Sequence, residues 1–91
     1  MELKKVAAMA EPMGILVSPH NPAGPLATAA SIQVCATLPN FTILEYAWGE
    51  VDWRGDLLTP PETIKDGHIE LTDKPGIGVE LNMDVVHRYK V

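Results

Sequence analysis

The feature that most constrains the fold is the order of a strand-like, a helix-like and a second strand-like segment, joined by short loops. The apolar run ILVS at residues 15–18 is typical of a strand buried on both faces, as in parallel sheets. Prolines and a glycine at residues 19–24 indicate a loop, and PLATAASIQVCATL at residues 25–38 predicts a helix with proline in its first turn. FTILEY at residues 41–46 predicts the second strand. The run therefore predicts a βαβ unit with two parallel strands and a right-handed crossover.

The flanking segments predict smaller elements. Residues 2–13 have helical apolar spacing and are followed by Gly14 in the position of a C-cap glycine, so the order becomes α-β-α-β. Beyond Tyr46 the chain is loop-like until Asp66-Gly67, a strong two-residue hairpin signal. The remaining predictions are a turn and short strand at residues 73–81 and a final helical turn capped by Asn82 or Asp84.

Composition excludes several classes of function. The net charge of −5 and the lack of a Lys/Arg cluster argue against a nucleic acid or an anionic membrane as partner. The single cysteine, Cys35, lies in an apolar stretch and is expected to be a buried, inert thiol. Charged residues interrupt residues 1–17, so no secretory signal is predicted, and no apolar run is long enough for a membrane span. We therefore expect a cytoplasmic protein.

Two ionisable residues stand at the ends of the two predicted strands. His20 follows the first strand and Glu45 lies at the end of the second. Because the carboxyl ends of parallel strands meet at one rim, both side chains should emerge close together. A histidine can exchange a proton near neutral pH, and a neighbouring carboxyl group can donate a hydrogen bond to a developing oxyanion. The pair suits proton transfer at a carbon next to a carboxylate; the alternative is that His20 is an ordinary surface residue of a proline-rich loop.

The loop after the second strand holds three further candidates. Trp48, Trp53 and Arg54 lie near the expected rim and are candidate substrate-binding residues. The alternative is structural: the tryptophans pack the loop down, and Arg54 pairs with Asp52 or Asp56. The acidic residues of this loop lack a metal-ligand spacing, and the histidines are spaced too irregularly for a zinc site.

Two stretches carry a resemblance to a known family. SPHNPAGPLATAASIQVCATLPNFTILEY and KPGIGVELN resemble the C-terminal portion of the mandelate racemase/muconate lactonizing enzyme branch of the enolase superfamily, and most nearly its sugar-acid (galactonate-type) dehydratases. The resemblance implies a capping domain, a modified (β/α)₈ barrel, and Mg²⁺ that stabilises an enediolate. It matches His20 to the histidine after the seventh strand, a general acid or base, and Glu45 to the carboxyl group on the eighth strand, which hydrogen-bonds the substrate carboxylate.

The resemblance also implies what this chain lacks. It assigns residues 1–62 to the last two strand/helix units of the barrel, and residues 63–91 to a hairpin-containing return segment that packs on the capping domain. A complete barrel needs roughly 250 residues. The family's metal-binding carboxylates lie on the third, fourth and fifth strands, which have no counterpart here, so no metal ligand is expected in this chain.

These observations lead to one hypothesis and two alternatives. The chain is interpreted as the C-terminal fragment of a Mg²⁺-dependent acid-sugar dehydratase that acts by α-proton abstraction and is inactive in isolation. A racemase or epimerase of the same superfamily would differ only in residues outside this chain. A non-catalytic packing or interaction module would instead assemble with its own copies or with a complementing barrel fragment, through sheet edges that lack a neighbour.

Overall fold

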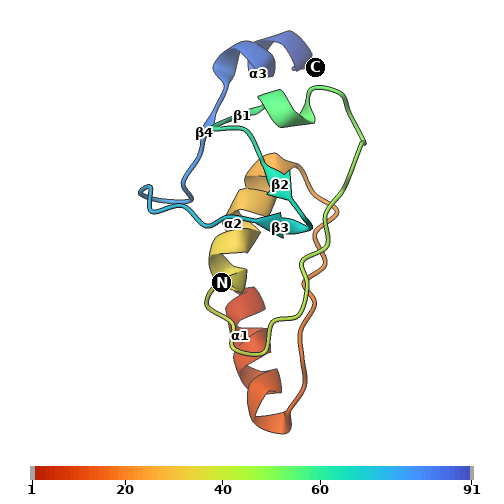
Figure 1. Cartoon of the computed structure of the whole chain (residues 1–91), viewed down its shortest axis with the longest axis vertical. Helices are drawn as coiled ribbons and strands as arrows, with labels where there is room; N and C mark the ends of the chain where they lie inside the picture. The colour runs from red at the N-terminus through yellow and green to blue at the C-terminus, as the bar shows by residue number, and fades with distance from the viewer. Residues whose placement is uncertain (1, 91) are drawn as a thin grey trace.

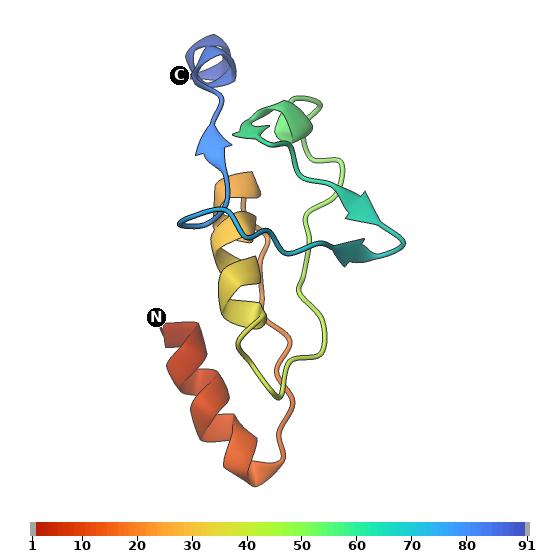
Figure 2. The ribbon, with the colours of Figure 1, turned by 60° about the vertical axis from the view of Figure 1, so that its left-hand side comes forward.

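The computed structural model describes residues 2–90 as an elongated molecule of 47 × 28 × 27 Å. Helix α1 lies at one end and helix α3 at the other, with α2 between them and two extended segments running along its side (Figures 1 and 2). In chain order the elements are α1 (Glu2–Ala10), the 3₁₀-helix η1 (Glu11–Met13), α2 (Pro25–Cys35), the 3₁₀-helix η2 (Arg54–Asp56), β1 (Leu58–Thr59), β2 (Ile64–Lys65), β3 (His68–Ile69), β4 (Glu80–Leu81) and α3 (Met83–Tyr89).

The two predicted strands pair in parallel, as the sequence indicates. Val17 N donates to Asn40 O at 2.8 Å, and Thr42 N donates to Val17 O at 3.0 Å. Only Val17 and Phe41 form a regular bridge, however, so the prediction of two full strands is wrong in its extent. Pro19 has no N–H for the next bond of the ladder, and its carbonyl accepts from Glu45 N at 3.2 Å. The proline thus ends the regular pairing but keeps the two segments in contact.

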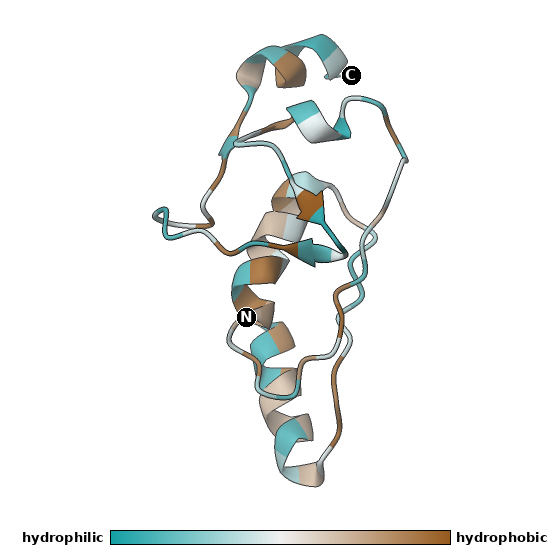
Figure 3. Ribbon diagram, in the orientation of Figure 1, coloured by the Kyte–Doolittle hydropathy of each residue, from teal (hydrophilic) through white to brown (hydrophobic). Residues whose placement is uncertain are grey.

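Helix α2 connects these segments and supplies much of the buried surface. It begins at Pro25, as predicted, and ends at Cys35, three residues earlier than expected. Thr28 is completely buried, and Ala29 and Cys35 are each 7% exposed. Burial raises the pKa of the Cys35 thiol, in agreement with the predicted inert cysteine. Figure 3 shows that apolar residues make up much of α2 and of the extended segment that precedes it.

An asparagine joins α1 to the parallel pair. The Asn40 side-chain amide donates to Ala7 O and to Ile15 O, each at 3.0 Å. Asn40 is buried, and Ala7 is 1% exposed. Helix α1 continues into η1 and ends at Gly14, which has a φ of 68° and donates to Glu11 O at 2.9 Å. The predicted C-cap is therefore confirmed.

The four short strands β1 to β4 form two antiparallel pairs, β1 with β4 and β2 with β3. In the predicted hairpin, Ile64 pairs with Ile69 and Lys65 with His68, and the two turn residues both have positive φ, 51° and 74°. This is the geometry for which Asp-Gly is favoured. β1 pairs with β4, which places the predicted short strand beside the loop that follows the second extended segment.

Helix α3 closes the described chain. The Asn82 side chain accepts from Asp84 N at 3.2 Å, so Asn82 is the N-cap and the helix extends over seven residues. Within residues 2–90, every helix is too short or too polar to cross a bilayer.

Candidate functional site

His20 and Glu45 lie beside each other at the ends of the two extended segments. His20 Nε2 is 3.5 Å from Glu45 Oε2, and 82% of the His20 side chain and 47% of the Glu45 side chain are exposed. The predicted proximity of the two side chains is confirmed. An exposed imidazole next to a carboxylate can meet a ligand from solvent and exchange a proton with it.

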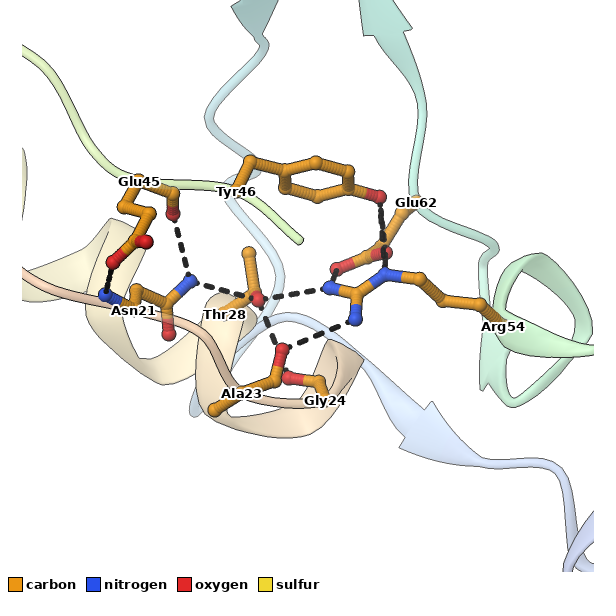
Figure 4. A network of polar contacts seen from close by, with 8 residues as sticks. All are labelled: Asn21, Ala23, Gly24, Thr28, Glu45, Tyr46, Arg54 and Glu62. Atoms are coloured by element: carbon orange, nitrogen blue, oxygen red, sulfur yellow. Dashed lines mark hydrogen bonds and ion pairs between the residues drawn. The ribbon is translucent and has the colours of Figure 1, made fainter. Parts of the chain in front are cut away.

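Asn21 links the two segments at this point. Its backbone N–H donates to Glu45 Oε2 at 2.8 Å, and its side-chain amide donates to Glu45 O at 3.1 Å (Figure 4). Asn21 itself is 4% exposed, although it neighbours the exposed His20. The carboxyl group of Glu45 is therefore oriented by the residue next to the histidine in the chain.

Thr28 continues this set of hydrogen bonds into the protein. Its hydroxyl accepts from Asn21 Nδ2 at 3.0 Å and from Arg54 Nη2 at 3.1 Å, and it donates to Gly24 O at 3.2 Å. A hydroxyl has one donor and two acceptor positions, so this buried group is fully satisfied. Thr28 thus ties the first turn of α2 to both Asn21 and Arg54.

Arg54 forms a buried ion pair beneath the loop that carries His20. Its Nε lies 3.1 Å from Glu62 Oε2, and both side chains are 8% exposed. Arg54 Nη1 also donates to Ala23 O at 3.1 Å, and Tyr46 OH donates to Glu62 Oε2 at 2.7 Å. The guanidinium carbon is 4.7 Å from the centre of the Tyr46 ring, within the range of a cation–π contact. We call Arg54, Glu62, Tyr46 and Thr28 the Arg54 cluster (Figure 4).

The cluster changes the pKa values of its members. Burial raises the pKa of the Tyr46 hydroxyl, and the negative charge of Glu62 acts in the same direction. For Arg54, burial alone would lower the pKa, but the contacts with Tyr46 and Glu62 outweigh it and the pKa is raised. Arg54 is therefore a permanent cation held by a carboxylate.

A sequence model of the family described as "Enolase C-terminal domain-like" matches residues 1–85. The chain belongs to this family. The D-xylonate dehydratase of Haloferax volcanii is 39% identical over 90 residues, which cover 99% of this chain and 22% of that enzyme. The D-gluconate/D-galactonate dehydratase of Picrophilus torridus is 40% identical over 82 residues, which cover 87% of this chain and 20% of that enzyme. Thus the chain spans about a fifth of the length of these relatives.

A solved structure agrees with the sequence relatives. The crystal structure of a mandelate racemase/muconate lactonizing enzyme-like protein from Rubrobacter xylanophilus matches 93% of this chain and 22% of its own chain, with a TM-score of 0.85 and 36% identity. The predicted family and fold class are confirmed: the chain is the C-terminal part of an enolase-type (β/α)₈ barrel.

The predicted substrate-binding residues occupy three different environments. Trp48 is 79% exposed, and its ring lies 6.2 Å from that of Tyr46. Trp53 stacks on Tyr89 of α3 at 5.0 Å, so it packs the loop down as the structural alternative predicts. Arg54 is buried, which favours a structural role. Its predicted pairing with Asp52 or Asp56 is wrong: both are exposed, and the buried guanidinium pairs with the equally buried Glu62.

The described part of this enolase-type chain does not fit a metal site of its own. Among residues 2–90 there is no group of three or more His, Cys, Asp or Glu residues that could hold a metal ion. His20 and Glu45 form a pair, and a divalent cation in a protein takes more ligands than that. No chemical step by a metal is therefore assigned to these residues.

Sequence reasoning missed the residues that support the pair. Asn21 in PHNP looks like a turn residue, Thr28 is a weak helix former near the start of a helix, and Glu62 follows two prolines in a loop. None of these patterns indicates burial. Arg54 was the one residue whose surroundings could have indicated a buried polar cluster, because it is a permanently charged side chain in a loop that contains apolar and aromatic residues.

We expect that removing one charge of the buried ion pair costs far more stability than removing one charge of an exposed pair. Glu62→Gln leaves the Arg54 guanidinium buried without its counter-charge and should lower the free energy of unfolding by about 3 kcal/mol. The same substitution at Glu2, whose side chain is 84% exposed and lies 3.1 Å from Lys5 Nζ, should cost about 0.5 kcal/mol or less. Urea unfolding followed by circular dichroism measures both. Equal effects of the two substitutions would contradict a stabilising role for the Arg54–Glu62 pair.

The raised pKa of Tyr46 predicts a loss of stability at high pH. The unfolded chain loses the tyrosine proton near the ordinary pKa, whereas the folded chain retains it to higher pH. The contribution of Tyr46 is therefore fully present below about pH 10 and falls as the pH rises through the folded-state pKa. The stability advantage of the wild-type chain over Tyr46→Phe should shrink between about pH 9 and pH 11. An advantage that is constant over this range would contradict the prediction.

Proposed function

We propose that this chain supplies the proton-transfer pair of a Mg²⁺-dependent acid-sugar dehydratase, as the C-terminal part of its barrel. The observation that carries the proposal is the 3.5 Å approach of His20 Nε2 to Glu45 Oε2 at the ends of two parallel segments. The dehydratase relatives that match nearly the whole chain support this choice of reaction.

The two side chains have separate tasks in the proposed reaction. His20 exchanges the proton on the carbon next to the substrate carboxylate, for which its exposed imidazole is suited. Glu45, oriented by Asn21, acts in this step as a carboxylic acid whose O–H donates to the carboxylate of the substrate as negative charge develops there. Removal of the α-proton followed by loss of the β-hydroxyl as water completes the dehydration. The metal ligands belong to a complete barrel and lie outside the residues described here.

The isolated chain is proposed to be inactive. The chain spans about a fifth of the length of its dehydratase relatives, whereas a (β/α)₈ barrel needs roughly 250 residues to close its site. Residues 1–62 would join the remaining barrel strands, and residues 63–91 would pack on a capping domain. The acid sugar would then bind at the rim formed by the assembled barrel, with Trp48 available to cover it.

Two other functions use the same surfaces. A racemase or epimerase would also need an acid–base group at the position of His20, so this chain alone does not separate it from a dehydratase. A packing or interaction module is favoured by the large apolar residues exposed on the extended pair, where Leu16 is 65% and Ile43 is 67% exposed. Sedimentation of the isolated chain at low micromolar concentration distinguishes this module: self-association supports it, and a monomer opposes it.

A chimaera tests the proposed chemistry. Residues 2–90 would replace the matching part of the Haloferax volcanii D-xylonate dehydratase, so that the remaining barrel is present. In this chimaera His20→Asn should lower turnover by about 10²–10⁴-fold, the usual loss for a general acid or base. Glu45→Gln should lower it less, because an amide still donates a hydrogen bond. Circular dichroism would check that each variant remains folded.

His68→Asn is the matched control for the histidine, since His68 is exposed in β3 of the hairpin. It should leave turnover of the chimaera unchanged. Near-normal turnover by His20→Asn in a chimaera that is itself active would contradict the assignment. The isolated wild-type chain, assayed with aldonates and Mg²⁺, should show no turnover above background.

A further inference from the structure

The position of His20 depends on its neighbours in the chain. Its side chain is 82% exposed, and its Nε2 lies 3.5 Å from the carboxyl oxygen Oε2 of Glu45. The residues on either side of it make three hydrogen bonds with Glu45: Glu45 N donates to Pro19 O, Asn21 N donates to Glu45 Oε2, and the side-chain Nδ2 of Asn21 donates to Glu45 O. The placement of the histidine relative to the carboxyl group is therefore determined mainly by Asn21.

Asn21 is in turn oriented by Thr28. Its side-chain amide has two N–H groups, one directed to Glu45 O and the other to Thr28 Oγ1. Reversing the amide would place its oxygen against the Glu45 carbonyl oxygen, which is an acceptor. Because Asn21 is buried, the lost hydrogen bond would not be replaced by bulk water. The Glu45 carbonyl and the Thr28 hydroxyl, whose own hydrogen is donated to Gly24 O, thus together select one orientation of the asparagine.

Arg54 contacts both this loop and the first turn of α2. Nη2 donates to the Thr28 hydroxyl, and Nη1 donates to Ala23 O, two residues after Asn21 in the chain. Glu62 binds the other edge of the guanidinium and keeps it in place. The loop at residues 19–24 is therefore held between Glu45 on one side and Arg54 on the other (Figure 4).

We propose that Arg54 is a positioning residue that fixes the geometry of the His20–Glu45 pair through Thr28 and Asn21. It does not contact the substrate, because its guanidinium is buried and engaged with internal partners. Glu62 begins the region that leads into the hairpin, so the loop that follows the barrel strands becomes part of the support of the pair. Only the catalytic consequence of this arrangement rests on the proposed function.

The test uses NMR spectra of the ¹⁵N-labelled 91-residue chain. Thr28→Val removes the hydroxyl and nearly preserves the shape of a completely buried side chain. The backbone amide and the side-chain amide of Asn21 should change chemical shift, and their hydrogens should exchange with solvent roughly tenfold faster, the effect of one lost hydrogen bond. Thr28→Ser retains the hydroxyl and should restore both signals.

Two internal controls separate positioning from general loosening. Thr42→Val removes another hydroxyl that bonds a carbonyl, Val17 O at 3.0 Å, and should leave Asn21 unchanged. The side-chain amide of Asn40, which donates to Ala7 O and Ile15 O, should keep its shifts in every variant. Unchanged Asn21 signals in Thr28→Val, or equal changes in Thr42→Val, would overturn the proposal.

A second variant decides the matter if Thr28→Val perturbs Asn40 as well. Arg54→Lys keeps a positive charge for Glu62 but has one nitrogen, which cannot donate to both Ala23 O and Thr28 in the fork geometry of arginine. Asn21 should then shift while Asn40 remains unchanged, and an unchanged Asn21 overturns the proposal. This readout does not involve turnover, so it fails or succeeds independently of the His20→Asn kinetics.

Discussion

The buried contact between Arg54 and Glu62 fixes a guanidinium that binds both the loop at residues 19–24 and the start of α2. Among residues 2–90, six apolar residues are buried, and three of them, Ala7, Ala29 and Cys35, are small, so apolar packing alone holds the segments together weakly. The ion pair joins residues that are only eight positions apart, but it holds the Arg54 guanidinium where it also contacts Ala23 and Thr28, which are 31 and 26 positions away in the sequence. Its desolvation cost is offset because Tyr46, Thr28 and the Ala23 carbonyl satisfy the remaining polar atoms.

The buried contact lies below the exposed pair at the rim and is linked to it through Thr28 and Asn21. The parallel pairing around Val17 brings the ends of the two extended segments together, and Pro19 stops the regular ladder one residue before His20. Beyond that point, Asn21 replaces ladder hydrogen bonds with side-chain ones. A site made from side chains needs support that a sheet would otherwise supply, and the Arg54 cluster provides it. In the proposed complete barrel, the remaining strands would join these two extended segments, on which Leu16 and Ile43 are exposed.

The sequence predicts the parts of this molecule that depend on local pattern. Asp66-Gly67 determines a turn because both residues adopt positive φ readily, and Asn82 caps a helix through its own side chain. The proximity of His20 and Glu45 was predictable from the strand–helix–strand order, whereas the contacts of Asn21 that fix it were not. The apolar runs did not show where the regular pairing of the two strands ends. It ends at Pro19, which has no N–H to donate, and this could be recognised only once the segment paired with Pro19 was known. The partner of Arg54 was also missed: Asp52 and Asp56 are nearer in sequence, but burial selects Glu62.

By its own contacts, this chain holds His20 beside Glu45. Nuclear Overhauser contacts between the imidazole hydrogens of His20 and the side-chain methylene hydrogens of Glu45 measure this most directly in the isolated chain. We expect such contacts to be present at neutral pH, together with those between Val17 and Phe41 that report the parallel pairing. If the Val17–Phe41 contacts were present and the His20–Glu45 contacts absent, the pair would not be preorganised in this chain, and the central claim would be wrong.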